Sequence, residues 1–85
     1  MLDELLILKK IKGGDIKAFE ELFRRYYFPL CCYAAGITGQ MEVAEEIVEE
    51  LFYVLWKERE RLQIFQSVKS YLYRATRNQS LQYCE

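Results

Sequence analysis

The stretch from Ala44 to Trp56, AEEIVEELFYVLW, constrains the fold most, because its apolar residues recur with the period of an α-helix. At about 100° per residue, one side of such a helix carries an apolar stripe. The stripe consists of Ala44, Ile47, Val48, Leu51 and Leu55. We therefore expect a helix that packs this stripe against a core, with Leu51 at its centre.

The opposite side of this predicted helix mixes acids with aromatic residues. It carries Glu45, Glu46, Glu49, Glu50, Tyr53 and Lys57, and Phe52 and Trp56 border the core stripe. Glutamates at a spacing of four repel each other, and each such pair destabilises a helix by roughly 0.2–0.5 kcal/mol. An acidic face in contact with solvent is the simplest interpretation. The neighbouring aromatic residues favour a protein interaction surface instead.

The rest of the chain also predicts helices, and no segment alternates as a strand does. We expect helices at about 2–12, 16–36, 41–59 and 67–83, which makes an all-α, compact four-helix domain. Gly13 and Gly14 end the first helix, and Asp15 is the expected N-cap of the second. Pro29 lies inside the second helix and predicts a kink rather than a break, because the apolar stripe continues in register.

Two of these helices have recognisable faces. The second helix directs a long apolar arc inward: Phe19, Leu22, Phe23, Tyr26, Leu30, Tyr33, Ala34 and Ile37. In the fourth helix the expected inward residues are Val68, Tyr71, Leu72, Ala75 and Tyr83. The expected outward residues are Lys69, Ser70, Tyr73, Arg74, Arg77 and Ser80. Cations beside a ring and small polar side chains suit phosphate and base contact, although a solvated face gives the same pattern.

Charge is divided unevenly along the chain. Residues 1–60 hold eight basic and twelve acidic side chains, a net charge of −4. Residues 61–85 hold four basic and one acidic side chain, a net charge of +3. The carboxyl-terminal segment is therefore the part of the chain that would attract a polyanion.

Several function classes are disfavoured by composition. The chain has 85 residues, which is one domain, and lacks histidine. Cys31, Cys32 and Cys84 lack metal-ligand spacing, so we expect no zinc site, no disulfide scaffold and no cofactor. No phosphate loop or nucleophile motif predicts an enzyme. No apolar run of about 20 residues predicts a membrane span, and acids within MLDELLILKK argue against a secretory signal, so we expect a cytoplasmic protein.

Four segments in this order resemble region 2 of extracytoplasmic-function sigma factors of bacterial RNA polymerase. The first two are Lys12-Gly13-Gly14-Asp15 and the run from Ala18 to Pro29, AFEELFRRYYFP. The others are Ala44 to Trp56 and the run from Ser67 to Asn78, SVKSYLYRATRN. The resemblance covers nearly the whole chain and implies the helical sigma-2 module, which binds the clamp helices of the polymerase beta-prime subunit and recognises and helps melt the promoter minus-ten element.

The resemblance also implies roles for particular residues. The surface that binds the beta-prime coiled coil would be Glu46, Glu49, Glu50, Phe52 and Trp56. The family commonly has glutamine at the position of Glu49, so here that contact would be ionic. The residues that face the minus-ten non-template strand would be Lys69, Ser70, Tyr73, Arg74, Arg77, Asn78 and Gln82, with the loop from Arg61 to Gln66 placed to capture a flipped base. Stacking on Phe65 or Tyr73 would offset part of the flipping cost.

A complete member of this family carries a second helical domain, region 4, which reads the minus-thirty-five element. This chain stops at Glu85, so we expect a fragment or excised domain without region 4. The resemblance further implies an anti-sigma protein as a regulatory partner. The competing hypothesis is a small helical adaptor or homodimer that binds protein through the Glu45 to Trp56 face and never contacts nucleic acid. It leaves the gathering of cations on the last helix unexplained.

Overall fold

Four α-helices and one turn of 3₁₀-helix make up the residues that the computed structural model describes, 3–63 and 67–85. The α-helices are α1 (Glu4–Lys12), α2 (Ile16–Thr38), α3 (Met41–Lys57) and α4 (Val68–Cys84). The 3₁₀ turn, η1 (Arg59–Arg61), follows α3. No strand occurs within these ranges, so the expectation of an all-α fold is confirmed.

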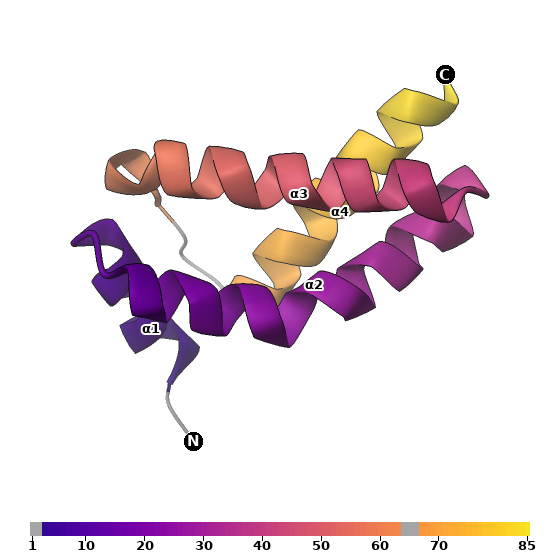
Figure 1. Cartoon of the computed structure of the whole chain (residues 1–85). Coiled ribbons are helices and arrows are strands. Elements are labelled where there is room, and N and C mark those ends of the chain that lie inside the picture. The colour runs from indigo at the N-terminus through magenta and orange to yellow at the C-terminus, as the bar shows by residue number, and fades with distance from the viewer. Residues whose placement is uncertain (1–2, 64–66) are drawn as a thin grey trace.

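The helices α2 and α3 form an antiparallel pair, and the other two helices pack against it. Figure 1 shows α2 and α3 running side by side in opposite directions, with α4 crossing behind them. The short helix α1 lies against the first half of α2. The four helices thereby surround one core, and α3 and α4 leave their outer sides open.

Local chemistry sets the helix ends. Asp15 caps α2 by accepting hydrogen bonds from the backbone N–H groups of Lys17 at 3.0 Å and Ala18 at 3.3 Å. Ser67 caps α4 in the same way, accepting from Ser70 N at 2.9 Å. Gly39 ends α2 in the left-handed region at φ 78°, where a side chain would be strained. Because Gly39 adopts this conformation, the chain can turn tightly from α2 into α3.

The helix α2 continues across Pro29 and ends at Thr38, two residues beyond the predicted end. Proline donates no backbone hydrogen bond, and its ring crowds the carbonyl of the residue four positions earlier. Figure 1 shows α2 bending near its middle, which fits the expected kink. The bend lets the second half of α2 stay beside α3.

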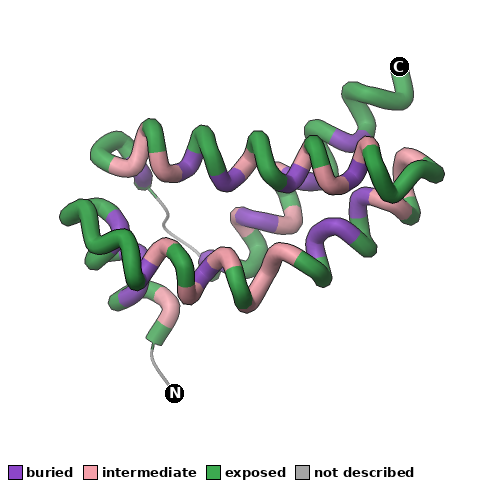
Figure 2. The backbone as a smooth tube through the Cα atoms, viewed as in Figure 1, coloured by how far each residue is buried: buried purple, intermediate pink, exposed green. Residues whose placement is uncertain are grey.

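The rotation of α3 about its axis differs from the predicted one. Its buried residues are Ala44, Val48, Phe52 and Leu55. Leu51 and Ile47 are only half-buried, so Leu51 is not the centre of the buried stripe. Phe52 holds that position, with 1% of its surface exposed. Figure 2 shows the buried stretches of α2 and α3 turned toward each other along the pair.

An aromatic cluster surrounds Phe52 at the contact between α2 and α3. The Phe23 ring lies 5.0 Å from the Phe52 ring, and the Phe19 ring lies 6.1 Å from it, both edge to face. Edge-to-face pairs at such distances are favourable beyond the area they bury. Further along α2, Cys31 is also buried, and burial raises the pKa of its thiol. The cluster fixes which side of α3 faces outward.

The helix α4 also buries a different arc from the predicted one. Val68, Leu72, Thr76 and Ser80 are buried, whereas Tyr83 is 51% exposed. Ser80 was expected to face outward and Tyr83 inward, and both expectations are wrong. The Thr76 hydroxyl donates to the Leu72 carbonyl at 2.8 Å, but the Ser80 hydroxyl has no hydrogen-bond partner within the described residues. Small side chains on this arc let α4 approach the α2–α3 pair closely.

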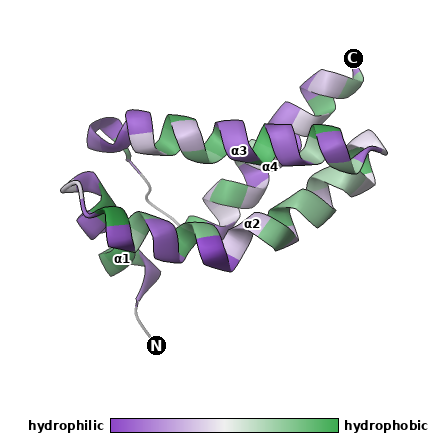
Figure 3. Cartoon of the chain, viewed as in Figure 1, coloured by the Kyte–Doolittle hydropathy of each residue, from purple (hydrophilic) through white to green (hydrophobic). Residues whose placement is uncertain are grey.

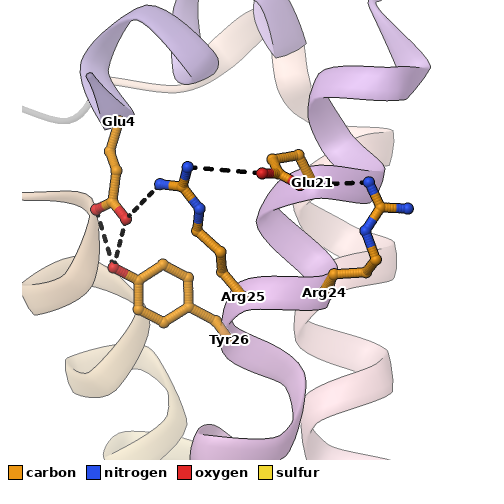
Figure 4. Close-up of polar contacts among 5 residues, drawn as sticks. All are labelled: Glu4, Glu21, Arg24, Arg25 and Tyr26. Carbon is orange, nitrogen blue, oxygen red and sulfur yellow. Dashed lines mark hydrogen bonds and ion pairs between the residues drawn. The ribbon is translucent and has the colours of Figure 1, made fainter. Parts of the chain in front are cut away.

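A polar network joins α1 to α2. The Tyr26 hydroxyl donates to the Glu4 carboxylate, with oxygen separations of 2.7 and 2.9 Å. The Arg25 guanidinium donates to Glu4 at 3.2 Å and lies 3.6 Å from Glu21, which also pairs with Arg24 (Figure 4). Burial and the adjacent Glu4 raise the pKa of Tyr26 from 10.0 to about 12. The short helix α1 is thus held by polar contacts as well as by its buried residues.

The rotation of α3 gives the first testable prediction. Phe52→Ala should lower the free energy of unfolding by about 3–5 kcal/mol, because a buried ring is replaced by a cavity. Leu51→Ala should cost less, since Leu51 is half-buried. Tyr53→Ala should change stability by only about 0.5 kcal/mol, because its ring is 59% exposed. Urea denaturation followed by circular dichroism gives the ranking, and a larger loss for Leu51→Ala than for Phe52→Ala would contradict this packing.

The network at Glu4 gives a prediction about alkaline pH. A phenol whose pKa is higher in the folded state stabilises the fold fully below pH 10, and this contribution is lost as the pH rises through about 12. Tyr26→Phe should lower stability at pH 7 by about 1 kcal/mol through the lost hydrogen bond. The same variant should lose less stability between pH 10 and 12 than the parent does. Urea melts at a series of pH values measure both effects, and Tyr53→Phe is the control. Parallel pH profiles for the parent and Tyr26→Phe would refute the assignment.

Candidate functional site

The outer side of α3 presents three of the acids predicted to form an interaction surface. Glu46, Glu49 and Glu50 are exposed. Figure 3 shows hydrophilic stretches recurring along α3, whereas the second half of α2 is mostly hydrophobic. Phe52 was predicted to belong to this surface, and that prediction is wrong, because Phe52 is buried against Phe19 and Phe23.

Trp56 is half-buried at the end of this surface. Its ring lies 5.1 Å from that of Phe19, centroid to centroid. The Arg59 guanidinium lies 4.3 Å from the Trp56 ring centroid and donates to the Trp56 carbonyl at 2.9 Å. A cation over an indole face is attracted by the ring quadrupole. Trp56 therefore offers part of its ring to a partner, with Arg59 as a neighbour that the sequence analysis did not include.

Tyr27 is a second residue of this surface that the sequence analysis missed. Its hydroxyl donates to Glu49 Oε2 at 3.0 Å, so it joins α2 to the acidic side of α3. No sequence signal connects these two positions, because they lie 22 residues apart and on different helices.

A hollow of about 380 Å³ opens between α3 and α4, next to Glu46 and Glu50. It is lined by Glu46, Ile47, Glu50, Leu51, Val54 and Gln79. The aliphatic side chains form an apolar floor, and the two carboxylates stand beside it. Such a combination suits a protein side chain with an apolar body and a positive end, such as that of lysine or arginine.

The outer side of α4 is basic. Lys69, Arg74 and Arg77 are exposed, and α4 contains no acidic residue. None of the three forms an ion pair with a residue in the ranges 3–63 and 67–85. The exposed polar side chains of Ser70, Asn78 and Gln82 lie on the same helix. Of the predicted nucleic-acid contacts, these six therefore share α4 and are open to a ligand.

The three remaining predicted contacts have different surroundings. Tyr73 is half-buried, and its ring packs edge to face with Tyr33 at 5.1 Å. Arg61 lies in η1, is highly exposed and pairs with Glu58 at 3.5 Å. Phe65 falls outside the described residues. Tyr73 is thus only partly exposed, and Arg61 lies on the segment that follows α3.

The described residues contain neither a candidate membrane-spanning helix nor a candidate metal-binding cluster. Among the described helices, none combines the length and the apolarity that crossing a bilayer would need. Within the same part of the chain, no three or more acidic, cysteine or histidine side chains gather where they could hold a metal ion. The two charged surfaces on α3 and α4 remain as the candidate functional sites.

Known proteins resemble this chain in sequence and in fold. The model of the family described as Sigma-70 region 2 matches residues 22–85. No curated protein matches the chain. A solved structure described as an engineered region 2 of sigmaE in complex with GTAAAA superposes with a TM-score of 0.82, covering 98% of this chain and 86% of that one at 22% sequence identity. That similarity establishes the fold, and the family match covers the helices that carry both charged surfaces.

Proposed function

This chain belongs to the sigma-70 region 2 family, and we propose that it binds the clamp helices of the RNA polymerase beta-prime subunit through α3 and a single promoter strand through α4. The observation that carries the proposal is the placement of opposite charges on adjacent helices. The exposed side of α3 presents the carboxylates of Glu42, Glu46, Glu49 and Glu50, and the exposed side of α4 presents three cations without an acid. A protein with basic residues suits the first surface, and a polyanion suits the second.

The proposed clamp surface consists of Glu46, Glu49, Glu50 and Trp56. Carboxylates at a protein interface steer a basic partner and fix its register. A partly exposed indole adds apolar contact area, and tryptophan is enriched among residues that dominate binding energy. The hollow between α3 and α4 extends this surface with apolar contacts.

The proposed DNA surface consists of Lys69, Ser70, Tyr73, Arg74, Arg77, Asn78 and Gln82 on α4, together with Arg61 and Phe65. Arginine and lysine supply contacts to phosphates, whereas amide and hydroxyl groups can pair with base edges. The similar structure is described as an engineered region 2 of sigmaE in complex with GTAAAA, which supports a nucleic-acid ligand for this chain. We propose the non-template strand of the minus-ten element as that ligand.

The remaining proposals concern context. From the family match, we propose an anti-sigma protein as a regulatory partner and the cytoplasm as the place of action. We further propose that the chain forms one region 2 domain. The adaptor or homodimer hypothesis explains the acidic surface equally well, but the family match and the basic side of α4 favour the sigma function.

The clamp proposal predicts the effect of a charge reversal. Glu50→Lys should weaken binding to an isolated beta-prime coiled coil by about fivefold to tenfold at low salt, because one side of a charge pairing is reversed. Glu60→Lys reverses an exposed charge on η1, outside the proposed surface, and is the matched control. Isothermal titration measures the affinities, and circular dichroism checks the fold. Unchanged affinity of a folded Glu50→Lys variant would refute the clamp surface.

The DNA proposal predicts different effects for two neighbouring residues. Arg77→Ala should weaken binding to every strand and reduce the salt slope by about one, because one counterion release is lost. Asn78→Ala should leave the salt slope unchanged and reduce discrimination between GTAAAA and the scrambled strand AAGATA, because an amide reads a base edge. Lys17→Ala, an exposed cation on α2, is the control.

Fluorescence anisotropy across a salt series, with polymerase core present, measures both effects on labelled strands. If both variants bind like the parent on both strands, α4 is a solvated face and the adaptor hypothesis gains the advantage. If only the strand discrimination changes in both variants, Arg77 reads a base rather than a phosphate.

A further inference from the structure

The hydrogen bond from Tyr27 to Glu49 joins helix α2 to the acidic surface of α3. The Tyr27 hydroxyl donates to Glu49 Oε2 at 3.0 Å. Burial, followed by the acceptor Glu49, raises the pKa of Tyr27 above its ordinary value. A tyrosine hydroxyl is protonated at neutral pH even without this shift, so it is a donor there.

The position of this donor is fixed by aromatic packing. The Tyr27 ring stacks on Phe23, with centroids 4.8 Å apart and planes inclined by 23°. Phe23 in turn packs edge to face against Phe52 at 5.0 Å. A phenol whose ring stacks on an aromatic side chain that is itself packed against the core has less freedom to move than an exposed glutamate side chain. Glu49 must therefore come to the hydroxyl, and the bond selects its side-chain conformation.

The neighbouring acids lack such a contact. Glu46 and Glu50 are exposed, and within residues 3–63 and 67–85 neither forms a hydrogen bond or ion pair through its side chain. A free glutamate loses rotamer entropy when a partner orders it. The bond to Tyr27 restricts Glu49 before any partner arrives. Its second oxygen, Oε1, stays available to a partner, because the bond uses Oε2.

We infer that Tyr27 is a positioning residue that holds the Glu49 carboxylate ready for a lysine or arginine of the partner, which makes Glu49 the main ionic anchor of the α3 surface. This inference rests on the proposed function, since it assumes that the surface binds a basic coiled coil. The physical basis is preorganisation: a group that is ordered before binding costs less to order during binding.

The first test uses the free protein and needs no partner. Nuclear magnetic resonance couplings give the side-chain rotamer populations of Glu49. We expect one dominant rotamer in the parent, averaged rotamers in Tyr27→Phe, and no change in Tyr26→Phe. The Tyr26→Phe control removes a tyrosine–glutamate hydrogen bond of the same kind, but to Glu4 on α1. Averaged Glu49 rotamers in the parent would overturn the inference whatever the protein binds.

The second test is a double-mutant cycle measured by titration against the isolated beta-prime coiled coil. Tyr27→Phe should weaken binding by about fivefold, and Glu49→Ala should weaken it by more. In the Glu49→Ala background, Tyr27→Phe should cause no further loss, and Tyr26→Phe should be neutral in both backgrounds. A merely structural role of Tyr27 would give the same loss with and without Glu49, and that result would overturn the inference.

The two tests separate the inference from the proposed function. If the parent does not bind the coiled coil although Glu49 is ordered by Tyr27, the clamp proposal fails together with the anchoring role. In that case the rotamer populations still decide whether Tyr27 positions Glu49. If the parent binds and Glu49→Ala binds equally well, the clamp proposal stands and the anchor assignment is wrong.

Discussion

The packing of Phe52 between Phe19 and Phe23 is the interaction on which the rest of the structure depends. It joins the two long helices and fixes the rotation of α3, since a buried ring of this size fits in one orientation only. The rotation decides which carboxylates are exposed and on which flank the α3–α4 hollow opens. The properties of the acidic surface therefore originate in the core.

Features that depend on nearby residues could be predicted from the sequence. Asp15 caps α2 and α2 continues across Pro29, because capping and the effect of proline act within one or two turns. The outward cations of α4 were also predictable, since a few charged residues on one face of a helix need no tertiary information. The four helices follow from the same local rules.

Features that depend on contacts between helices could not be predicted. The apolar band of α3 is wide, because it includes Ile47, Leu51 and Phe52. Periodicity therefore does not decide whether Leu51 or Phe52 lies at the centre of the buried side. Close packing then favoured Phe52 as the centre. Ser80 is buried because α4 approaches its neighbours closely, although a serine on its own suggests exposure. The bond from Tyr27 to Glu49 joins positions whose proximity only the folded chain reveals.

The three cysteines of this chain lie in very different surroundings, and this makes thiol chemistry informative. Cys32 and Cys84 are exposed, whereas Cys31 is buried and burial raises the pKa of its thiol. Alkylating reagents attack the thiolate, which a raised pKa makes scarce, and they must also reach the sulfur. Two cysteines are therefore open to labelling in the native protein, and the third becomes reactive only when α2 and α3 separate. The rate at which Cys31 is alkylated is thus an intrinsic measure of how often the core of this domain opens.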